Sequence, residues 1–170
     1  MQACEATGVL LAQPLTAAAF SPYGTVIVAP ANGGTLINEG TAERFELLAD
    51  LKLTHDGGRP VLSVSRASAR SFPFTLREME RHALGSQSFV PLGARRFVVV
   101  VAAAGSAPGT DDLRAFITDG EQGVCLSPGT WHHGLLAVDA GDYVVLERRA
   151  SAVDCDIHTL DRPRLLMLPG

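Results

Sequence analysis

The stretch Phe97-Val98-Val99-Val100-Val101-Ala102-Ala103-Ala104 is the longest apolar run of the chain. Its eight residues are too few to cross a bilayer as a helix, which takes about 20 apolar residues. A short apolar run of this kind, bounded by charged residues on one side and Gly105 on the other, is typical of a buried strand. The stretch therefore predicts a strand over residues 96–103 in the centre of a β-sheet.

Similar short segments lie on both sides of this strand, and Gly and Pro separate them. Residues 59–67 alternate apolar and polar side chains, which is typical of a strand with one solvated face. Residues 75–81 form either a turn of helix or an edge strand. A short capped helix is expected at 16–20, and further strands are expected at 25–29, 44–48, 86–90, 113–118, 123–126, 133–138 and 143–148. Strands at this spacing predict an all-β sandwich or barrel.

Composition limits the classes of protein to which the chain can belong. Its 170 residues suit one domain, spanning 1–170, that is large enough to fold without a disulfide or a structural metal. A net charge of −4 with no cluster of basic residues argues against a nucleic-acid surface. The three cysteines lack the spacing of a metal site, and no signal peptide or membrane-length segment is evident. We expect a cytoplasmic protein with no membrane partner.

Two sequence patterns carry the chemistry. Glu80-x-His82-x-x-x-x-Gln87 places two polar side chains on one face of a strand and a third on the next strand, and Gly129-x-x-His132 follows much later. Taken singly, each residue has a simpler explanation. His82 could lie on the surface, Glu80 could pair with a neighbouring arginine, and one histidine of the His132-His133 pair is expected to be structural. Only their joint occurrence in a β-barrel predicts a site.

Cupin barrels resemble this arrangement, because they hold a metal or substrate with His-x-His-x-x-x-x-Glu followed by Gly-x-x-His. The chain keeps the cupin spacing but has Glu80 and Gln87 at two of the four ligand positions. Over about residues 14–160 it is similar to the ureidoglycolate lyase family. The resemblance is carried by Leu62-Ser-Val-Ser-Arg-Ala67, Glu78-Met-Glu-Arg-His82, Gly85-Ser-Gln-Ser-Phe-Val-Pro91, Leu113-Arg-Ala-Phe-Ile-Thr-Asp-Gly-Glu-Gln-Gly123, Trp131-His-His133 and Asp154-Cys-Asp156.

The resemblance implies a cupin-like double-stranded β-helix, or jelly-roll barrel, with a few short helices. It also implies a homodimeric enzyme of allantoin degradation in purine and nitrogen metabolism, which cleaves (S)-ureidoglycolate to glyoxylate and urea. Members of the family are described as using a divalent metal, with nickel the usual assignment.

Cleavage of this substrate needs a base for the hydroxyl proton, an acid or electrophile at the departing nitrogen, and a cation for the carboxylate. His132 or His82 is expected to be the base, with Glu80 orienting its partner or acting as the base itself. Arg66, on a strand expected to face inward, or else Arg96 or Arg114, is expected to hold the carboxylate. Gln87, Trp131 and His133 complete the expected substrate-binding set.

A metal, if bound, is expected to have Glu80, His82, Gln87 and His132 as ligands and to act as a Lewis acid. Nickel, manganese and zinc all accept such a set, and Gln87 is a weaker ligand than the glutamate of metal cupins, which favours a loosely held metal or none. Two other functions stay open at this point. One is a different cupin enzyme that acts on a small hydroxy acid or a sugar derivative, and the other is a non-catalytic cupin that binds a small carboxylate.

Overall fold

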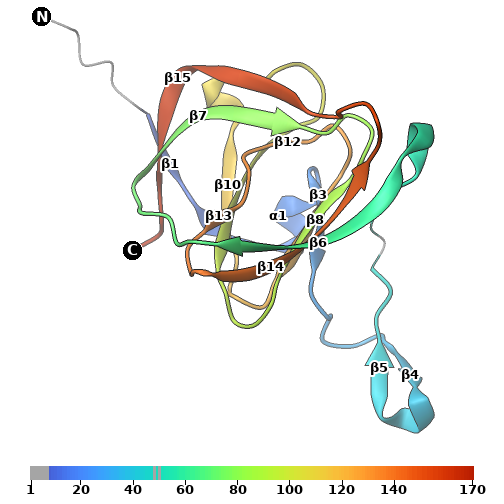
Figure 1. Ribbon diagram of the computed structural model, residues 1–170. Coiled ribbons are helices and arrows are strands. Elements are labelled where there is room, and N and C mark those ends of the chain that lie inside the picture. The colour runs from blue at the N-terminus through green and yellow to red at the C-terminus, as the bar shows by residue number, and fades with distance from the viewer. Residues whose placement is uncertain (1–7, 48, 50) are drawn as a thin grey trace, which may run out of the picture.

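The computed structural model describes residues 8–47, 49 and 51–170. Two sheets face each other (Figure 1), and one of the two clusters of buried hydrophobic side chains lies between them. The larger sheet has the order β1-β15-β7-β12-β9-β10-β2, with β13 paired to β9, and the smaller has the order β3-β11-β8-β14-β6.

The elements have the following bounds. The larger sheet contains β1 (Val9–Leu11), β2 (Gln13–Pro14), β7 (Phe74–Arg81), β9 (Phe97–Ala102), β10 (Arg114–Ile117), β12 (Trp131–His132), β13 (Leu136–Ala137) and β15 (Asp156–Met167). The smaller sheet contains β3 (Gly24–Ile27), β6 (Arg59–Ala67), β8 (Gln87–Pro91), β11 (Gly123–Leu126) and β14 (Gly141–Arg149). The remaining elements of the described residues are the hairpin of β4 (Thr35–Ile37) and β5 (Ala42–Arg44), the helix α1 (Ala17–Phe20), and three 3-10 turns at Asn38–Gly40, His55–Gly57 and Thr110–Asp112.

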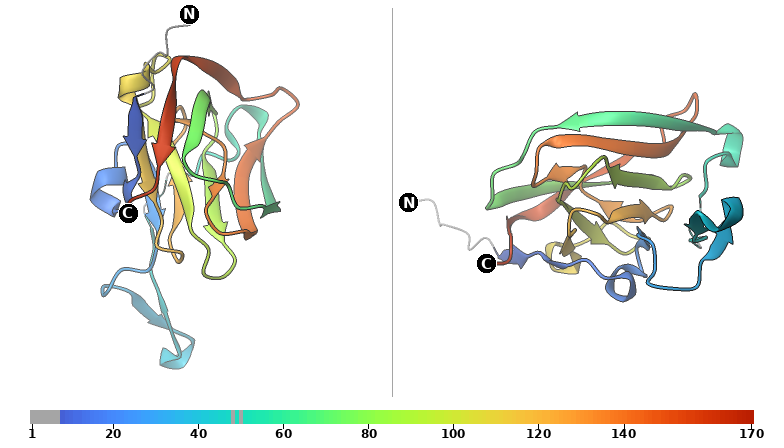
Figure 2. Two further views of the ribbon diagram at one scale, coloured as in Figure 1. Left: turned by 90° about the vertical axis from the view of Figure 1, so that its left-hand side faces the viewer. Right: turned by 90° about the horizontal axis from the view of Figure 1, so that it is seen from below.

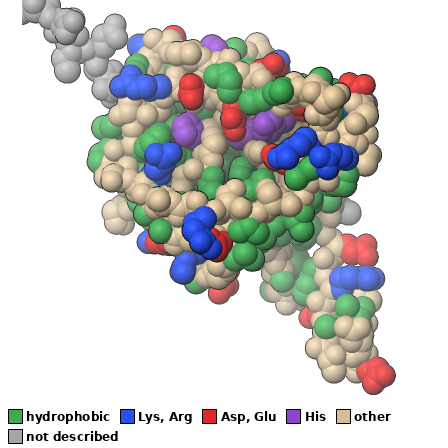
Figure 3. Space-filling view, viewed as in Figure 1, with side chains coloured by type: hydrophobic (Ala, Val, Ile, Leu, Met, Phe, Trp, Pro, Cys, Tyr) green, Lys and Arg blue, Asp and Glu red, His purple; other side chains and the backbone are tan. Residues whose placement is uncertain are grey.

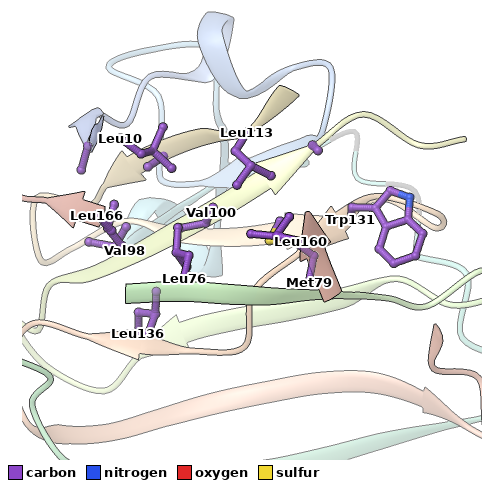
Figure 4. Close-up of a cluster of buried hydrophobic side chains, with 13 residues drawn as sticks. Leu10, Leu76, Met79, Val98, Val100, Leu113, Trp131, Leu136, Leu160 and Leu166 are labelled. Atoms are coloured by element: carbon purple, nitrogen blue, oxygen red, sulfur yellow. The ribbon is translucent and has the colours of Figure 1, made fainter. Parts of the chain in front are cut away.

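Strand β9 organises the core because its side chains are buried on both faces. Phe97, Val99 and Val101 point between the two sheets, where they pack with side chains of the smaller sheet such as Phe89 and Val145. The alternate side chains point the other way, into a second cluster with residues of β1, β7, β13 and β15 (Figure 4). The period of two along a strand thus places the long apolar run in two cores at once.

The β4–β5 hairpin stands away from the two facing sheets (Figure 1 and the left view of Figure 2). Its register pairs Thr35 with Arg44 and Ile37 with Ala42, and Leu36 at its centre is largely exposed. No helix among the described residues has the length and apolar character needed to span a membrane.

The expected fold class is confirmed, because the chain is an all-β, cupin-like barrel with few and short helices. Residues 59–67 form β6 as predicted. Helix α1 also forms as predicted, and the Thr16 hydroxyl accepts a hydrogen bond from the N–H of Ala19 at its start.

Some element predictions were wrong. Residues 75–81 belong to β7, which is paired on both sides and is not an edge strand. A strand was expected at 44–48, but β5 ends at Arg44, and residue 48 lies outside the described part of the chain. Of the strand expected at 133–138, only Leu136–Ala137 forms a strand, β13, and the preceding strand β12 ends at His132. Strands β1, β2, β4 and β15 were not predicted. The longest of them, β15, has no period of two, because its register with β7 shifts between Thr159 and Arg164.

Candidate active site

Strand register brings two of the predicted residues together. Glu80 of β7 is paired directly with His132 of β12, and His132 is paired with Val101 of β9. Paired residues point to the same face of a sheet, and Val101 belongs to the core between the two sheets. Glu80 and His132 therefore point into the interior of the barrel, and His132 is only 1% exposed.

The turn at Gly129 brings His132 close to His82. Gly129 has a φ of +81°, in the left-handed region that glycine adopts without strain, and its N–H donates to the main-chain oxygen of His82 at 2.7 Å. The ring centroids of His82 and His132 are 5.2 Å apart as a result. The spacing Gly-x-x-His thus has a physical cause, since the turn ties the start of β12 to the end of β7.

Both ring nitrogens of His132 face oxygen acceptors. Nε2 lies 3.0 Å from Oε1 of Gln87 and 3.4 Å from Oε1 of Glu80, and Nδ1 lies 3.0 Å from the main-chain oxygen of Thr130. A neutral imidazole has only one N–H, so this arrangement suits a ring that carries a second proton or an Nε2 atom that faces a metal ion. We call Glu80, His82, Gln87 and His132 the polar cluster.

His82 is oriented differently from His132. Its Nδ1 atom lies 2.6 Å from the main-chain oxygen of Asp154, so Nδ1 carries the proton, and Nε2 holds a lone pair. Nε2 is buried and has no hydrogen-bond partner among the described residues. The Asp154 carboxylate accepts hydrogen bonds from the N–H groups of Ala83, Leu84 and Gly85, and so fixes the turn that follows His82.

The surroundings of Glu80 favour its ionised form. The hydrogen bond with His132 lowers the pKa of the Glu80 carboxyl below its ordinary value, and it outweighs burial, which acts in the opposite direction. The Cys155 thiol lies 4.0 Å from Oε2 of Glu80. Burial, followed by the negative charge of Glu80, raises the pKa of Cys155, which keeps this thiol protonated at neutral pH.

The possible ligand atoms of the polar cluster lie close enough together to bind one divalent metal ion. The ligand atoms of Glu80, His82 and His132 all lie within 4.8 Å of one another. Oε1 of Gln87 faces the same point from the smaller sheet. The buried lone pair of His82 Nε2 and the convergence of oxygen acceptors on His132 Nε2 both fit a positive ion between these side chains.

A cavity of about 300 Å³ opens beside His82. The end of β14 and the connection to β15 line it with Glu147, Arg149, Asp154 and Cys155. Figure 3 shows histidine and acidic side chains beside a hollow on this face, with basic side chains at its rim. Arg149 is 56% exposed, and its guanidinium contacts the Glu147 carboxylate at 3.4 Å. The cavity therefore combines a buried imidazole with an exposed cation.

The three arginines expected to hold a carboxylate lie elsewhere. The prediction that Arg66 faces inward is wrong, because its side chain is 86% exposed and forms an ion pair with Asp142. Arg66 follows Leu62 and Val64 on the exposed face of β6, whereas Ser63 and Ser65 lie on the partly buried face. Arg96 pairs with Asp139 through two hydrogen bonds of 3.0 Å. Arg114 donates to main-chain oxygens near its own strand.

Trp131 points away from the polar cluster, and His133 acts on its Glu80 only through charge. Trp131 belongs to the core on the opposite face of the larger sheet, and the Arg81 guanidinium lies 4.7 Å from its ring centroid. The His133 ring packs edge-on against Phe74, and its Nδ1 lies 3.0 Å from the main-chain oxygen of Gly134. Two residues that follow each other on a strand face opposite ways, which separates Trp131 from His132.

Sequence reasoning did not place Glu147, Arg149 and Asp154 at this cavity. Glu147 shares a face of β14 with Tyr143 and Val145, both of which are buried between the sheets, so its alternation could have placed it inside the barrel. No comparable signal exists for Asp154, since its contacts with residues 83–85 join segments that are about 70 residues apart.

Comparison with known proteins agrees with this geometry. The family model described as ureidoglycolate lyase matches residues 7–167. A ureidoglycolate lyase of Burkholderia cepacia is 45% identical over 152 residues, which is 88% of this chain and 85% of the relative. Ureidoglycolate lyases of Pseudomonas syringae pv. syringae and Pseudomonas putida (strain W619) are each 39% identical over 160 residues, covering 94% of this chain and 94% and 96% of the relatives. The chain belongs to the ureidoglycolate lyase family.

Proposed function

We propose that the protein is a ureidoglycolate lyase, which cleaves (S)-ureidoglycolate to glyoxylate and urea in the breakdown of allantoin. Family membership over residues 7–167 supports the reaction. The observation that carries the mechanism is the buried lone pair of His82 Nε2, which lies beside the ionised Glu80 and the doubly hydrogen-bonded ring of His132.

In the protein without a bound metal, proton transfer is divided between the two histidines. The substrate carries a hydroxyl group and a ureido nitrogen on one carbon. His82 Nε2 accepts the hydroxyl proton, the C–O bond becomes a carbonyl, and the C–N bond breaks with its electron pair going to nitrogen. The proton on His132 Nε2, which Glu80 and Gln87 hold in place, neutralises the departing nitrogen, so that urea leaves as a neutral molecule.

Arg149 holds the carboxylate of the substrate. Its guanidinium stands at the cavity that His82 also lines, and a planar guanidinium binds carboxylates well. Arg148, its neighbour, is not available for this role because it donates to the main-chain oxygens of His55 and Asp56.

A divalent metal, with nickel as the ion that the family resemblance implies, fits the same cluster. Glu80, His82, Gln87 and His132 would hold it through two oxygens and two imidazole nitrogens. When bound, such an ion supplies Lewis-acid stabilisation of the negative charge that develops on the substrate oxygen.

Urea release from racemic ureidoglycolate, measured with and without a chelator, tests the function. We expect urea and glyoxylate in equal amounts. Loss of activity on chelation with recovery by Ni²⁺ supports a metal enzyme, and full activity in protein shown to be metal-free assigns the reaction to the histidine pair alone. Binding of glyoxylate without urea release would instead support a non-catalytic carboxylate-binding cupin, and turnover of another hydroxy acid would support a different cupin enzyme.

We also propose that residues 1–170 act as one domain and that two copies form a homodimer. The outer face of the smaller sheet supports a dimer, because Leu62 and Val64 of β6 are 72% and 59% exposed beside an apolar groove. Light scattering on the purified protein should give twice the monomer mass, and Leu62→Glu should shift it to the monomer. A monomer in the unmodified protein would contradict this proposal. The cytoplasmic location stays a prediction.

A further inference from the structure

We propose that Glu147 is a positioning residue that turns the amide oxygen of Gln87 toward the polar cluster and thereby makes the cluster a site for a cation. The inference rests on the proposed function only in taking the polar cluster as the reaction centre. It adds a residue from outside the cluster and assigns it a definite task.

Strand pairing places the two side chains together. Gln87 of β8 is directly paired with Glu147 of β14, so both side chains point into the barrel. Nε2 of Gln87 donates to Oε2 of Glu147 at 3.0 Å, and Oε1 of Gln87 lies 3.0 Å from Nε2 of His132. The Gln87 amide thus forms a bridge between Glu147 and His132, and it is largely buried.

The two ends of this amide are not equivalent. The NH2 group only donates hydrogen bonds and the carbonyl oxygen only accepts them, whereas a carboxylate only accepts. Glu147 therefore requires the NH2 end of Gln87, and the oxygen is left to face His132. The reversed amide would place its oxygen against the Glu147 carboxylate, which is unfavourable at 3.0 Å in a partly buried setting. Arg149 contacts the other oxygen of Glu147 from the solvent side.

This orientation determines what can occupy the cluster. With the oxygen of Gln87 and the carboxylate of Glu80 both turned toward His132 Nε2, that point is favourable only for a proton or a metal ion. A reversed amide would donate to Nε2 instead, while Nδ1–H still donated to the main-chain oxygen of Thr130. That alternative gives both ring nitrogens of His132 a hydrogen-bond partner, removes the N–H that faces Glu80, and blocks a cation. Glu147 excludes it.

The Glu147→Gln variant allows the Gln87 amide to adopt the reversed orientation, because the new side-chain amide can donate to the Gln87 oxygen. We expect the dissociation constant for Ni²⁺, measured by calorimetry on metal-stripped protein, to rise about 10- to 100-fold, the usual effect of losing a residue that orients a metal ligand. In the double variant Gln87→Glu with Glu147→Gln, residue 87 can only accept again, so the affinity should recover. Asp142→Asn, on the same strand but in a surface ion pair, should leave it unchanged.

A second measurement separates orientation from the loss of a charge. Nuclear Overhauser contacts of the Gln87 NH2 protons should lie toward residue 147 in the unmodified protein and move toward the His132 ring in Glu147→Gln. Unchanged contacts, or equal Ni²⁺ affinities of the unmodified protein and Glu147→Gln, would overturn the role of Glu147. These readouts do not depend on turnover, so weakened Ni²⁺ binding with reoriented contacts would support the inference even in a protein that releases no urea.

Discussion

The ring of His82 lies with Nδ1 2.6 Å from the main-chain oxygen of Asp154, and this contact decides how the two interior histidines differ. A carbonyl oxygen can only accept, so the His82 proton is on Nδ1 and the lone pair is on Nε2. His132 faces acceptors with both nitrogens. One histidine is therefore arranged to accept a proton and the other to hold one, although the two rings are neighbours.

Replacing His82 removes the group to which we assign proton abstraction. We expect His82→Ala to reduce kcat by about two decades or more, on the scale of a lost general base. His55→Ala, at an exposed 3-10 turn, is the matched control and should retain normal turnover. Near-normal kcat in a folded His82→Ala protein would transfer the role of base to Glu80 or His132.

Asp154→Asn tests whether the turn after His82 positions this histidine. Asparagine keeps one acceptor oxygen for Ala83, but its NH2 group cannot accept at the position where Oδ2 receives the N–H groups of Leu84 and Gly85. The variant should therefore lose about 1–3 kcal/mol of stability in guanidinium chloride unfolding. Its kcat should also fall, with KM changed less. The control is Asp156→Asn, an exposed partner of Arg81, which should lose no more than about 1 kcal/mol and retain kcat. Equal effects of the two changes would argue against a special role for Asp154.

Comparing Arg149→Gln with Arg66→Gln identifies the cation that holds the substrate carboxylate. Losing a charge-assisted hydrogen bond of about 1.5–3 kcal/mol raises KM about 10- to 100-fold. We expect this increase for Arg149→Gln, which stands at the cavity, and an unchanged KM for Arg66→Gln, which is paired on the outer face. The opposite result would restore the expectation drawn from the sequence.

The Asp139–Arg96 pair should make stability depend on pH. The hydrogen bonds from the Arg96 side chain and main chain lower the pKa of Asp139 in the folded protein. A lowered pKa stabilises the fold above the ordinary aspartate pKa of about 3.9, and this contribution disappears as the pH falls through the lowered value. The pair is partly exposed, so we expect Asp139→Asn to be less stable at pH 7 by at most about 1 kcal/mol. The free energies of unfolding of the unmodified protein and of Asp139→Asn should converge between pH 7 and pH 3. A difference that does not change with pH would contradict a contribution from the lowered pKa of Asp139.

Much of the barrel could be predicted from local patterns. Alternation along 59–67 and the apolar run at 97–104 each mark a strand, because a strand places successive side chains on opposite faces. Where local pattern and pairing disagree, prediction failed. Strand β15 includes charged residues and a register shift, and only its pairing with β7 makes it a strand.

The four residues of the polar cluster were predicted together, since the spacings of Glu80, His82, Gln87 and His132 can be read directly from the sequence. The choice among arginines was not, because exposure and ion pairing depend on partners distant in sequence. Arg66 and Asp142 meet across β6 and β14, and nothing near residue 66 indicates this contact.

By itself, the sequence determined that this protein is a β-barrel of the ureidoglycolate lyase family with a cluster of two histidines, a glutamate and a glutamine. Only the tertiary structure decided what each of these groups does. The choice of the ring nitrogen of His82 that carries the hydrogen depends on an oxygen of Asp154, 72 residues away, and the orientation of Gln87 depends on Glu147, 60 residues away. A hydrogen-bonding side chain adopts a defined orientation only when folding places its partners within about 3 Å, and no local sequence pattern specifies those partners.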